Sequence, residues 1–101
     1  MNDKDSIRNE TIPILNDENC SMIKTSFCGE YPYLANKVST RYFLIMDGEA
    51  EFDIDGKKSI LKQKDIIMIP PNTKYKFRGN FETTIIDMPA FRQENEVIVD
   101  E

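Results

Sequence analysis

The sequence predicts a single all-β domain built from short strands as a barrel or a sandwich. Its 101 residues suffice for one compact domain and for no second one. From Thr11 onward, runs rich in Ile, Phe, Tyr, Thr and Met alternate with turn signals at the roughly 8–12-residue spacing that is typical of such folds. No stretch of helical length repeats its apolar residues with the period of a helix.

The chain divides into three parts. Residues 1–11 are polar apart from Met1 and Ile7, so we expect a mobile N-terminal arm or an edge segment that becomes ordered late. Residues 12–90 form the β-barrel, and residues 91–101 form a C-terminal tail. The tail either closes the sheet or exchanges between subunits, and the sequence leaves both open.

The expected strands are separated by residues that favour turns. In chain order, the strands are 11–15, 20–28, 38–46, 49–54, 57–61, 65–69, 74–77, 83–87 and 97–99. Asp47-Gly48 and Asp55-Gly56 are dipeptides that accept positive φ, so each predicts a tight hairpin turn. Pro70-Pro71 ends the strand before it, because proline has no N–H to donate to a sheet.

Two strands carry patterns that predict which side is buried. In 49–54 the apolar Ala50, Phe52 and Ile54 alternate with acidic residues, so we expect Glu49, Glu51 and Asp53 to face water. After its first residue the strand 65–69 is continuously apolar, which predicts a strand covered on both faces.

Composition excludes several classes of function. Thirteen Lys and Arg against eighteen Asp and Glu give a net charge of −5, the wrong sign for a nucleic-acid binder. No apolar run approaches the length of a membrane helix, and the charged N-terminus does not resemble a signal peptide, so we expect a cytoplasmic protein. No histidine occurs, which removes the commonest general base. Cys20 and Cys28 are expected to be free, buried or half-buried thiols.

Two segments resemble the core of a cupin, a double-stranded β-helix or jelly-roll barrel. The first runs from Tyr42 through Asp47-Gly48 to Gly56, and the second runs from Lys64 through Pro70-Pro71-Asn72-Thr73 to Phe77. With the family's spacing, Gly29, Gly48 and Pro70 match its motifs. Asn72 stands where the family has Gly, and it tolerates the left-handed backbone that this position implies.

The resemblance also shows what this chain lacks. In metal-binding cupins three His and one Glu hold a divalent ion, and the corresponding places here read Ala35, Lys37, Arg41 and Tyr75. A methyl group, two cations and a phenol are not ligands for Fe, Mn, Ni or Zn. We therefore expect a metal-free protein without a cofactor.

If the strands keep the family's facing, Arg41 and Phe43 point into the barrel together with Tyr75 and Phe77. An inward guanidinium beside a phenol, with Lys37 near, predicts a site for a small anionic or polyhydroxylated metabolite. The candidate ligand-binding residues are Arg41, Tyr75, Lys37, Phe43, Phe77 and Asp87.

The alternatives stay open at this stage. Asp87 or Glu30 could neutralise Arg41 internally, because a buried charge needs a partner. Tyr75 could be a core aromatic residue, and Lys37 could face water. Whether the protein is an enzyme is not decided; if it is, a metal-independent isomerase, epimerase or lyase is implied. A third reading is a regulatory module that acts through protein contacts.

One face of the strand 38–46 predicts self-association. Tyr42, Leu44 and Met46 lie opposite Arg41, and unless another strand covers them they form an apolar patch. In so small a domain such a patch favours a homodimer.

Overall fold

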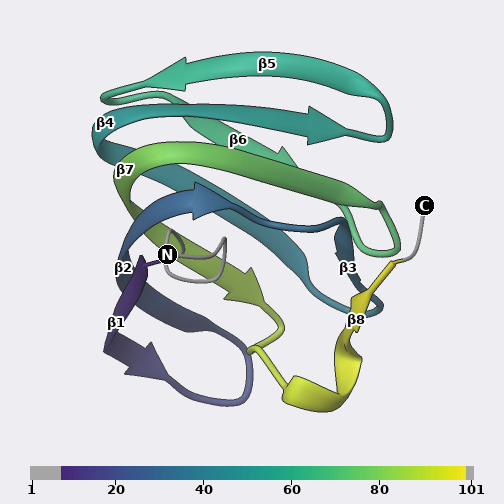
Figure 1. Ribbon diagram of the computed structural model, residues 1–101. Coiled ribbons are helices and arrows are strands. Elements are labelled where there is room, and N and C mark those ends of the chain that lie inside the picture. Colours follow the sequence, from purple (N-terminus) through teal and green to yellow (C-terminus); the bar gives the residue numbers. More distant parts are fainter. Residues whose placement is uncertain (1–7, 100–101) are drawn as a thin grey trace.

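The computed structural model describes residues 8–99, and it is built almost entirely from β-strands (Figure 1). The strands are β1 (Arg8–Asn16), β2 (Ser21–Glu30), β3 (Leu34–Asn36), β4 (Thr40–Ile54), β5 (Lys57–Lys62), β6 (Ile66–Ile69), β7 (Tyr75–Met88) and β8 (Glu96–Ile98). One short 3-10 helix, η2 (Gln93–Asn95), precedes β8. This arrangement confirms the all-β prediction.

Two long strands, β4 and β7, hold the barrel together. They pair antiparallel along almost their whole length, from Thr40 opposite Met88 to Ile54 opposite Tyr75. β6 pairs with the first part of β4, and β5 pairs with its last part. β2 pairs with β7 from Arg78 to Asp87, β1 continues the sheet beyond β2, and β3 pairs with β7 at Tyr75. β4 and β7 therefore run through the whole barrel, and the sheet curls around them (Figure 1).

The curvature is located at two glycines. Gly48 on β4 and Gly79 on β7 have φ of 86° and 142°, and a register shift lies between Ile45 and Asp47. A side chain at Gly48 would meet the backbone oxygen of Asn80, and one at Gly79 would meet that of Glu49. Only glycine lets the two backbones approach so closely.

The predicted hairpin at Asp47-Gly48 is therefore wrong. The two residues lie inside β4 at a bulge, so the expected strands 38–46 and 49–54 form one strand that begins at Thr40. The same holds for 74–77 and 83–87, which join in β7. The turn at Asp55-Gly56 is confirmed, since both residues have positive φ and join β4 to β5.

The two ends of the described chain differ from the sequence division. Residues 1–7 of the expected arm lie outside the described residues, while residues 8–11 are the start of β1. The tail contributes β8, which pairs with β3, a strand that the sequence did not predict. Within this chain the tail thus extends the sheet. Asn72 adopts the expected left-handed backbone, with φ of 61°.

The core is the inward face of the barrel. Its buried members are Phe27, Leu34, Phe43, Ile45, Ala50, Phe52, Ile69, Tyr75 and Phe81. Phe77 packs against them, and its ring lies 4.9 Å from that of Phe27 and 5.3 Å from that of Phe52. Closely packed aromatic rings therefore make up much of the inward face of the barrel.

Two expectations about exposure fail. β6 is covered on one face only, because Ile66 and Met68 are more than half exposed while Ile69 is buried. On β4 the carboxylate of Asp53 is buried, where it accepts hydrogen bonds from the Tyr33 hydroxyl and from the backbone N–H of Gly56. These two hydrogen bonds, one to each oxygen, offset the free-energy cost of burying the carboxylate.

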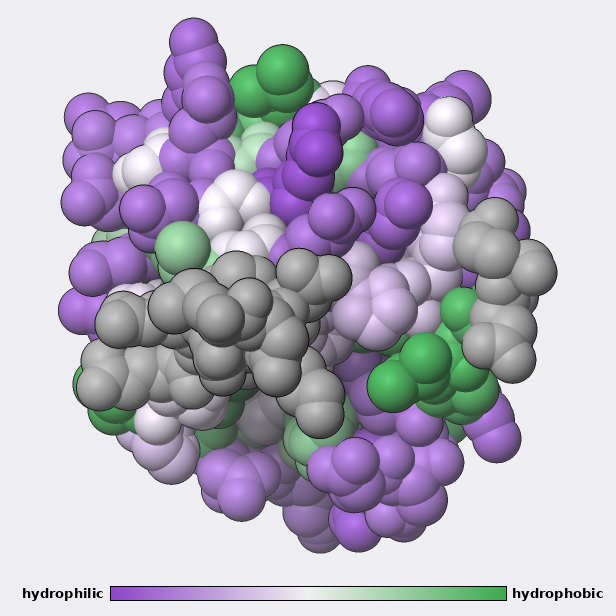
Figure 2. Space-filling model, in the orientation of Figure 1, coloured by the Kyte–Doolittle hydropathy of each residue, from purple (hydrophilic) through white to green (hydrophobic). Residues whose placement is uncertain are grey.

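The molecular surface is mainly hydrophilic on the face shown in Figure 2, where hydrophobic residues appear as separate small groups. No helix formed by residues 8–99 has the length and apolar character that crossing a bilayer demands. Both cysteines are free and half-buried, as predicted.

Candidate functional site

A cavity of about 410 Å³ occupies the interior of the barrel. Its apolar walls are made by Ile23, Phe27, Tyr31, Leu34, Phe43, Phe77, Phe81 and Ile85, and its polar groups include Ser21, Thr25, Arg41, Tyr75, Thr83, Asp87 and Glu96. The volume is that of a typical small-molecule site, which is mostly apolar with a few polar groups that orient the ligand.

The exposed residues among the lining mark the mouth of the cavity. Pro13, Leu15 and Asn16 at the end of β1 are exposed, as is Phe91 in the segment after β7. The Phe91 ring also lies 5.7 Å from the guanidinium carbon of Arg41. The end of β1 and Phe91 thus border the opening of the cavity, and Arg41 lines its interior.

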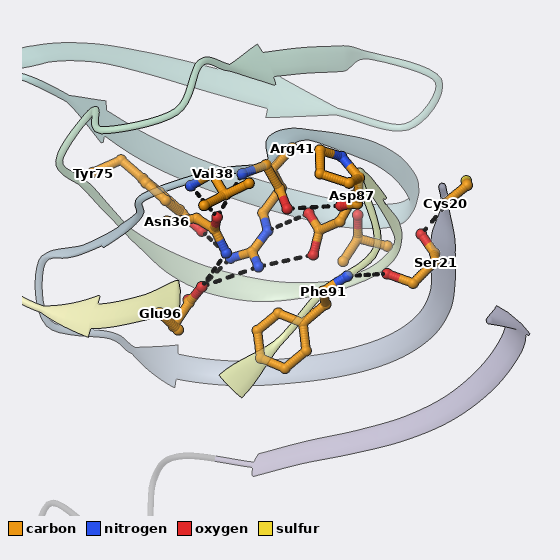
Figure 3. Close-up of polar contacts among 12 residues, drawn as sticks. Cys20, Ser21, Asn36, Val38, Arg41, Tyr75, Asp87, Phe91 and Glu96 are labelled. Atoms are coloured by element: carbon orange, nitrogen blue, oxygen red, sulfur yellow. Dashed lines mark hydrogen bonds and ion pairs between the residues drawn. The ribbon is translucent and has the colours of Figure 1, made fainter. Parts of the chain in front are cut away.

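Arg41 is the centre of the polar end, and all five of its N–H groups are occupied (Figure 3). Nε and Nη2 donate to the two oxygens of Asp87, at 2.7 and 2.9 Å. Nη1 and Nη2 donate to the two oxygens of Glu96, at 3.0 and 3.1 Å. The fifth N–H, on Nη1, donates to the Tyr75 hydroxyl at 2.7 Å. A guanidinium has five donors, so none remains for a ligand in this arrangement.

The strands position these groups directly. Arg41 and Asp87 are opposite one another on the paired strands β4 and β7, and both side chains point inward. Tyr75 lies at the start of β7, and β8 brings Glu96 to the same place. The Asn36 side chain on β3 donates to Glu96 Oε1 at 3.2 Å, so that this oxygen accepts from both Asn36 and Arg41. Four strands therefore meet at one guanidinium.

The protonation states follow from these contacts. Burial works to lower the pKa of Arg41, but Asp87, Tyr75 and Glu96 outweigh it and raise that pKa above its ordinary value. Burial raises the pKa of Tyr75, although the neighbouring Arg41 opposes the change. At neutral pH Arg41 is thus charged and Tyr75 is neutral.

The structure brings together most of the predicted site residues. Arg41, Phe43, Tyr75, Phe77 and Asp87 all line the cavity. Lys37 does not: its side chain is exposed, and it lies outside the set that lines the cavity, which is the alternative that the sequence left open. Likewise, Arg41 is neutralised by Asp87, one of the two carboxylates proposed as internal partners; Glu30 lines a different surface depression.

Sequence reasoning missed Glu96 and Phe91. Both belong to the tail, whose path depends on the pairing of β8 with β3. The available signal was an acidic residue directly before the β-branched run 97–99, and that signal does not distinguish an inward carboxylate from a solvated one.

The four places that hold a metal in other proteins of this fold do not form a metal site here. Ala35 carries a methyl group, Lys37 is exposed, Arg41 is a cation, and Tyr75 is a neutral phenol that accepts a hydrogen bond from Arg41. The two carboxylates nearby, those of Asp87 and Glu96, are bound to Arg41. A guanidinium at the centre repels a divalent ion, so this donor set does not fit Fe, Mn, Ni or Zn.

Solved structures with the same architecture identify the fold, although no protein-family model and no curated protein matches the chain. Pac13 from Streptomyces, described as a nucleoside dehydratase, has a TM-score of 0.83 and 18% identity over 94% of this chain and 86% of its own. A Pac13 variant with uridine has 22% identity and a TM-score of 0.81 over 85% and 72% of the two chains. The Cnp3 cupin domain of Schizosaccharomyces pombe has 12% identity and a TM-score of 0.75 over 82% and 67%. This protein has the cupin fold that its two sequence motifs predicted.

Proposed function

We propose that this protein binds a neutral, hydroxyl-rich metabolite in the barrel cavity and does so without a metal. The observation that carries the proposal is the pairing of Arg41 with two carboxylates at the inner end of the cavity. One cation between two anions and a neutral phenol leaves a net charge of −1 on this cluster. Of the two ligand types that the sequence left open, an anionic and a polyhydroxylated one, the second suits such a site.

Hydrogen-bond capacity supports the same choice. An ionised carboxylate has about four acceptor positions. Arg41 occupies two of those on Asp87, while Arg41 and Asn36 together occupy three on Glu96. The cluster therefore offers free acceptors and no free guanidinium donor. Hydroxyl groups supply the donors that such acceptors require, whereas a carboxylate or phosphate supplies none.

The remainder of the cavity favours a ligand with an apolar or planar part. The rings of Tyr31 and Phe77 are stacked at 5.3 Å, and both line the cavity together with Phe27. A nucleoside combines a planar base with a hydroxylated sugar, and a Pac13 variant of the same fold is known with uridine. We therefore place nucleosides and neutral sugars first among the candidate ligands.

A thermal-shift panel tests the proposal, since a ligand that binds only the native state raises its melting temperature. Uridine, adenosine and neutral pentoses and hexoses are compared with sugar acids and sugar phosphates. We expect stabilisation by at least one neutral compound. If the anionic members alone stabilise the protein, the proposal is wrong.

A pair of adjacent residues supplies a matched control. Ile85 lines the cavity, and Ile86 is on the opposite face of the same strand. The substitution Ile85→Trp fills the cavity and should abolish the stabilisation, whereas Ile86→Trp should leave it unchanged. Equal binding by both variants would mean that the ligand site lies elsewhere.

A second candidate function is a lyase, which the description of Pac13 as a nucleoside dehydratase favours. In a dehydration, the carboxylate of Asp87 or Glu96 would take a proton from a carbon of the substrate. A double bond would form, the neighbouring hydroxide would leave, and the same carboxylic acid would return the proton to it as water. No metal enters this sequence of steps.

Mass spectrometry of nucleosides incubated with the protein tests the lyase directly. A product lighter by one water, formed by the wild type and absent with Glu96→Gln and Asp87→Asn, would support it. Binding of a nucleoside without any such product would leave the protein as a binding protein. The cytoplasmic location, the absence of nucleic-acid partners and the homodimer stay predictions.

A further inference from the structure

Glu96 occupies the part of Arg41 that would otherwise bind an anion. The terminal nitrogens Nη1 and Nη2 each donate one N–H to Glu96, at 3.0 and 3.1 Å, in the bidentate arrangement that guanidinium groups form with carboxylates and phosphates (Figure 3). The side chain thus fills the position that the acid group of a ligand would take.

The two carboxylates on Arg41 are not equivalent. Asp87 belongs to the long strand β7, is directly opposite Arg41, and has a side chain that is only 4% exposed. Glu96 belongs to the three-residue strand β8, and its side chain is 19% exposed. Asp87 is therefore part of the barrel wall, and Glu96 is an added group at the edge of the cavity.

We propose that Glu96 is the residue that determines ligand charge: it acts as a built-in anion that keeps acidic metabolites off Arg41 and reserves the cavity for uncharged, hydroxylated ones. This deepens the function proposed above and rests on it as far as the natural ligand is concerned. The ligands that Glu96 excludes are the phosphorylated or carboxylated forms of the same metabolite.

The charge of the cluster and the number of free donors on Arg41 both depend on Glu96. With Glu96 present, the cluster has a net charge of −1 and Arg41 has no free donor. Without it, Arg41 and Asp87 balance one another, and two parallel N–H groups face the vacated space. A guest carboxylate then restores the original pair of charge-assisted hydrogen bonds, which gives bidentate geometry as well as attraction.

Acetate is a direct probe, because it carries the carboxylate that Glu96→Ala removes. We expect acetate to raise the melting temperature of Glu96→Ala at concentrations that leave the wild type unchanged. Glu94→Gln is the matched control on η2, where the side chain is exposed, and it should respond as the wild type does. The double variant Arg41→Ala/Glu96→Ala should not be stabilised by acetate, since it lacks the guanidinium that would bind the acetate carboxylate.

A second measurement uses a pair of ligands that differ in charge. Isothermal titration with uridine and uridine 5′-monophosphate is compared for the wild type and Glu96→Gln, which keeps the size of the side chain. The ratio of the two affinities should shift toward the monophosphate by about tenfold or more in the variant, because removing one negative charge changes the net charge of the cluster from −1 to 0. The titration of Glu96→Gln still tests the role of Glu96 if Glu96→Ala fails to fold.

The outcomes separate this inference from the proposed function. If acetate stabilises Glu96→Ala and the wild type equally, and the affinity ratio does not change in Glu96→Gln, Glu96 does not select charge. If no hydroxylated compound stabilises the wild type, the proposed function fails, while the acetate experiment still decides the role of Glu96.

Discussion

Arg41 and Asp87 are opposite one another on β4 and β7 and form a two-pronged ion pair, with N···O distances of 2.7 and 2.9 Å, inside a barrel whose walls are otherwise mainly apolar. The pair lies next to the cavity, and both side chains are more than nine-tenths buried. Its position means that one arginine serves the fold and the site at the same time.

Replacing Arg41 by Ala should destabilise the protein strongly. The change leaves the carboxylates of Asp87 and Glu96 without their cation, and breaking a buried ion pair in this way costs about 3–5 kcal/mol. Chemical denaturation followed by circular dichroism measures the free energy of unfolding. Arg78→Ala is the control: its ion pair with Glu51 is largely exposed and should contribute less than about 1 kcal/mol. Equal losses in the two variants would contradict the internal role of Arg41.

Tyr75 should make the stability of the protein sensitive to alkaline pH. Burial raises the pKa of its phenol above the ordinary value, so the folded state holds this proton more tightly than the unfolded state does. The resulting stability is fully present below a pH of about 10 and is lost as the pH rises further toward the pKa in the folded protein. Unfolding free energies of the wild type and Tyr75→Phe at increasing pH should therefore converge above that value. Parallel curves would refute the prediction.

The two glycines at the bend of the barrel should be intolerant of any side chain. Gly48→Ala and Gly79→Ala each place a methyl group against the backbone of the opposite strand, and the expected loss is about 3 kcal/mol or more. Gly56 also has positive φ, but nothing lies within 4 Å of its missing side chain, so Gly56→Ala should cost only about 1–2 kcal/mol. Melting temperatures rank the three variants, and a Gly56 variant at the bottom of the ranking would contradict this account.

The homodimer predicted from the sequence has a defined candidate surface, the outer apolar face formed by Tyr42, Leu44, Met46, Ile66 and Met68 on β4 and β6. Equilibrium sedimentation should give twice the 11.8 kDa mass of one chain. Met68→Lys should halve that mass without loss of folding, while Ile98→Lys, which changes a side chain 66% exposed on β8, should not. A wild type that sediments as one chain at micromolar concentration would disprove self-association.

Removal of metal should have no effect on binding. Because the positions used for metal in related folds hold Ala35, Lys37, Arg41 and Tyr75, we expect dialysis against EDTA to leave both the melting temperature and the response to a neutral ligand unchanged. Elemental analysis of the purified protein should find Fe, Mn, Ni and Zn only far below one equivalent. A loss of binding that added metal restores would overturn the metal-free proposal.

The sequence predicted the fold and the inward residues well because both depend on local patterns. Alternation placed Phe52 inside, and the spacing of the cupin motifs placed Arg41, Phe43, Tyr75 and Phe77 in the barrel. These inferences need only the side-chain period of a strand and a known strand order.

The errors concern contacts between distant parts of the chain. Asp47-Gly48 has the composition of a hairpin turn, but the close approach of β7 makes it a bulge within one continuous strand. Glu96 is 55 residues from Arg41, and nothing in its neighbourhood indicates that β8 carries it to the cavity. Lys37 follows β3, and its exposure depends on where that strand ends.

The continuous pairing of β4 with β7 also has a kinetic consequence. Separating β4 from β7 to open the cavity would break the ladder from Thr40 to Ile54, a step comparable to unfolding. A molecule that binds in the cavity as proposed would first meet Phe91 and the end of β1, the exposed part of the lining. Association and release rates should then vary with the bulk of the side chain at position 91, while the shape of the barrel stays the same.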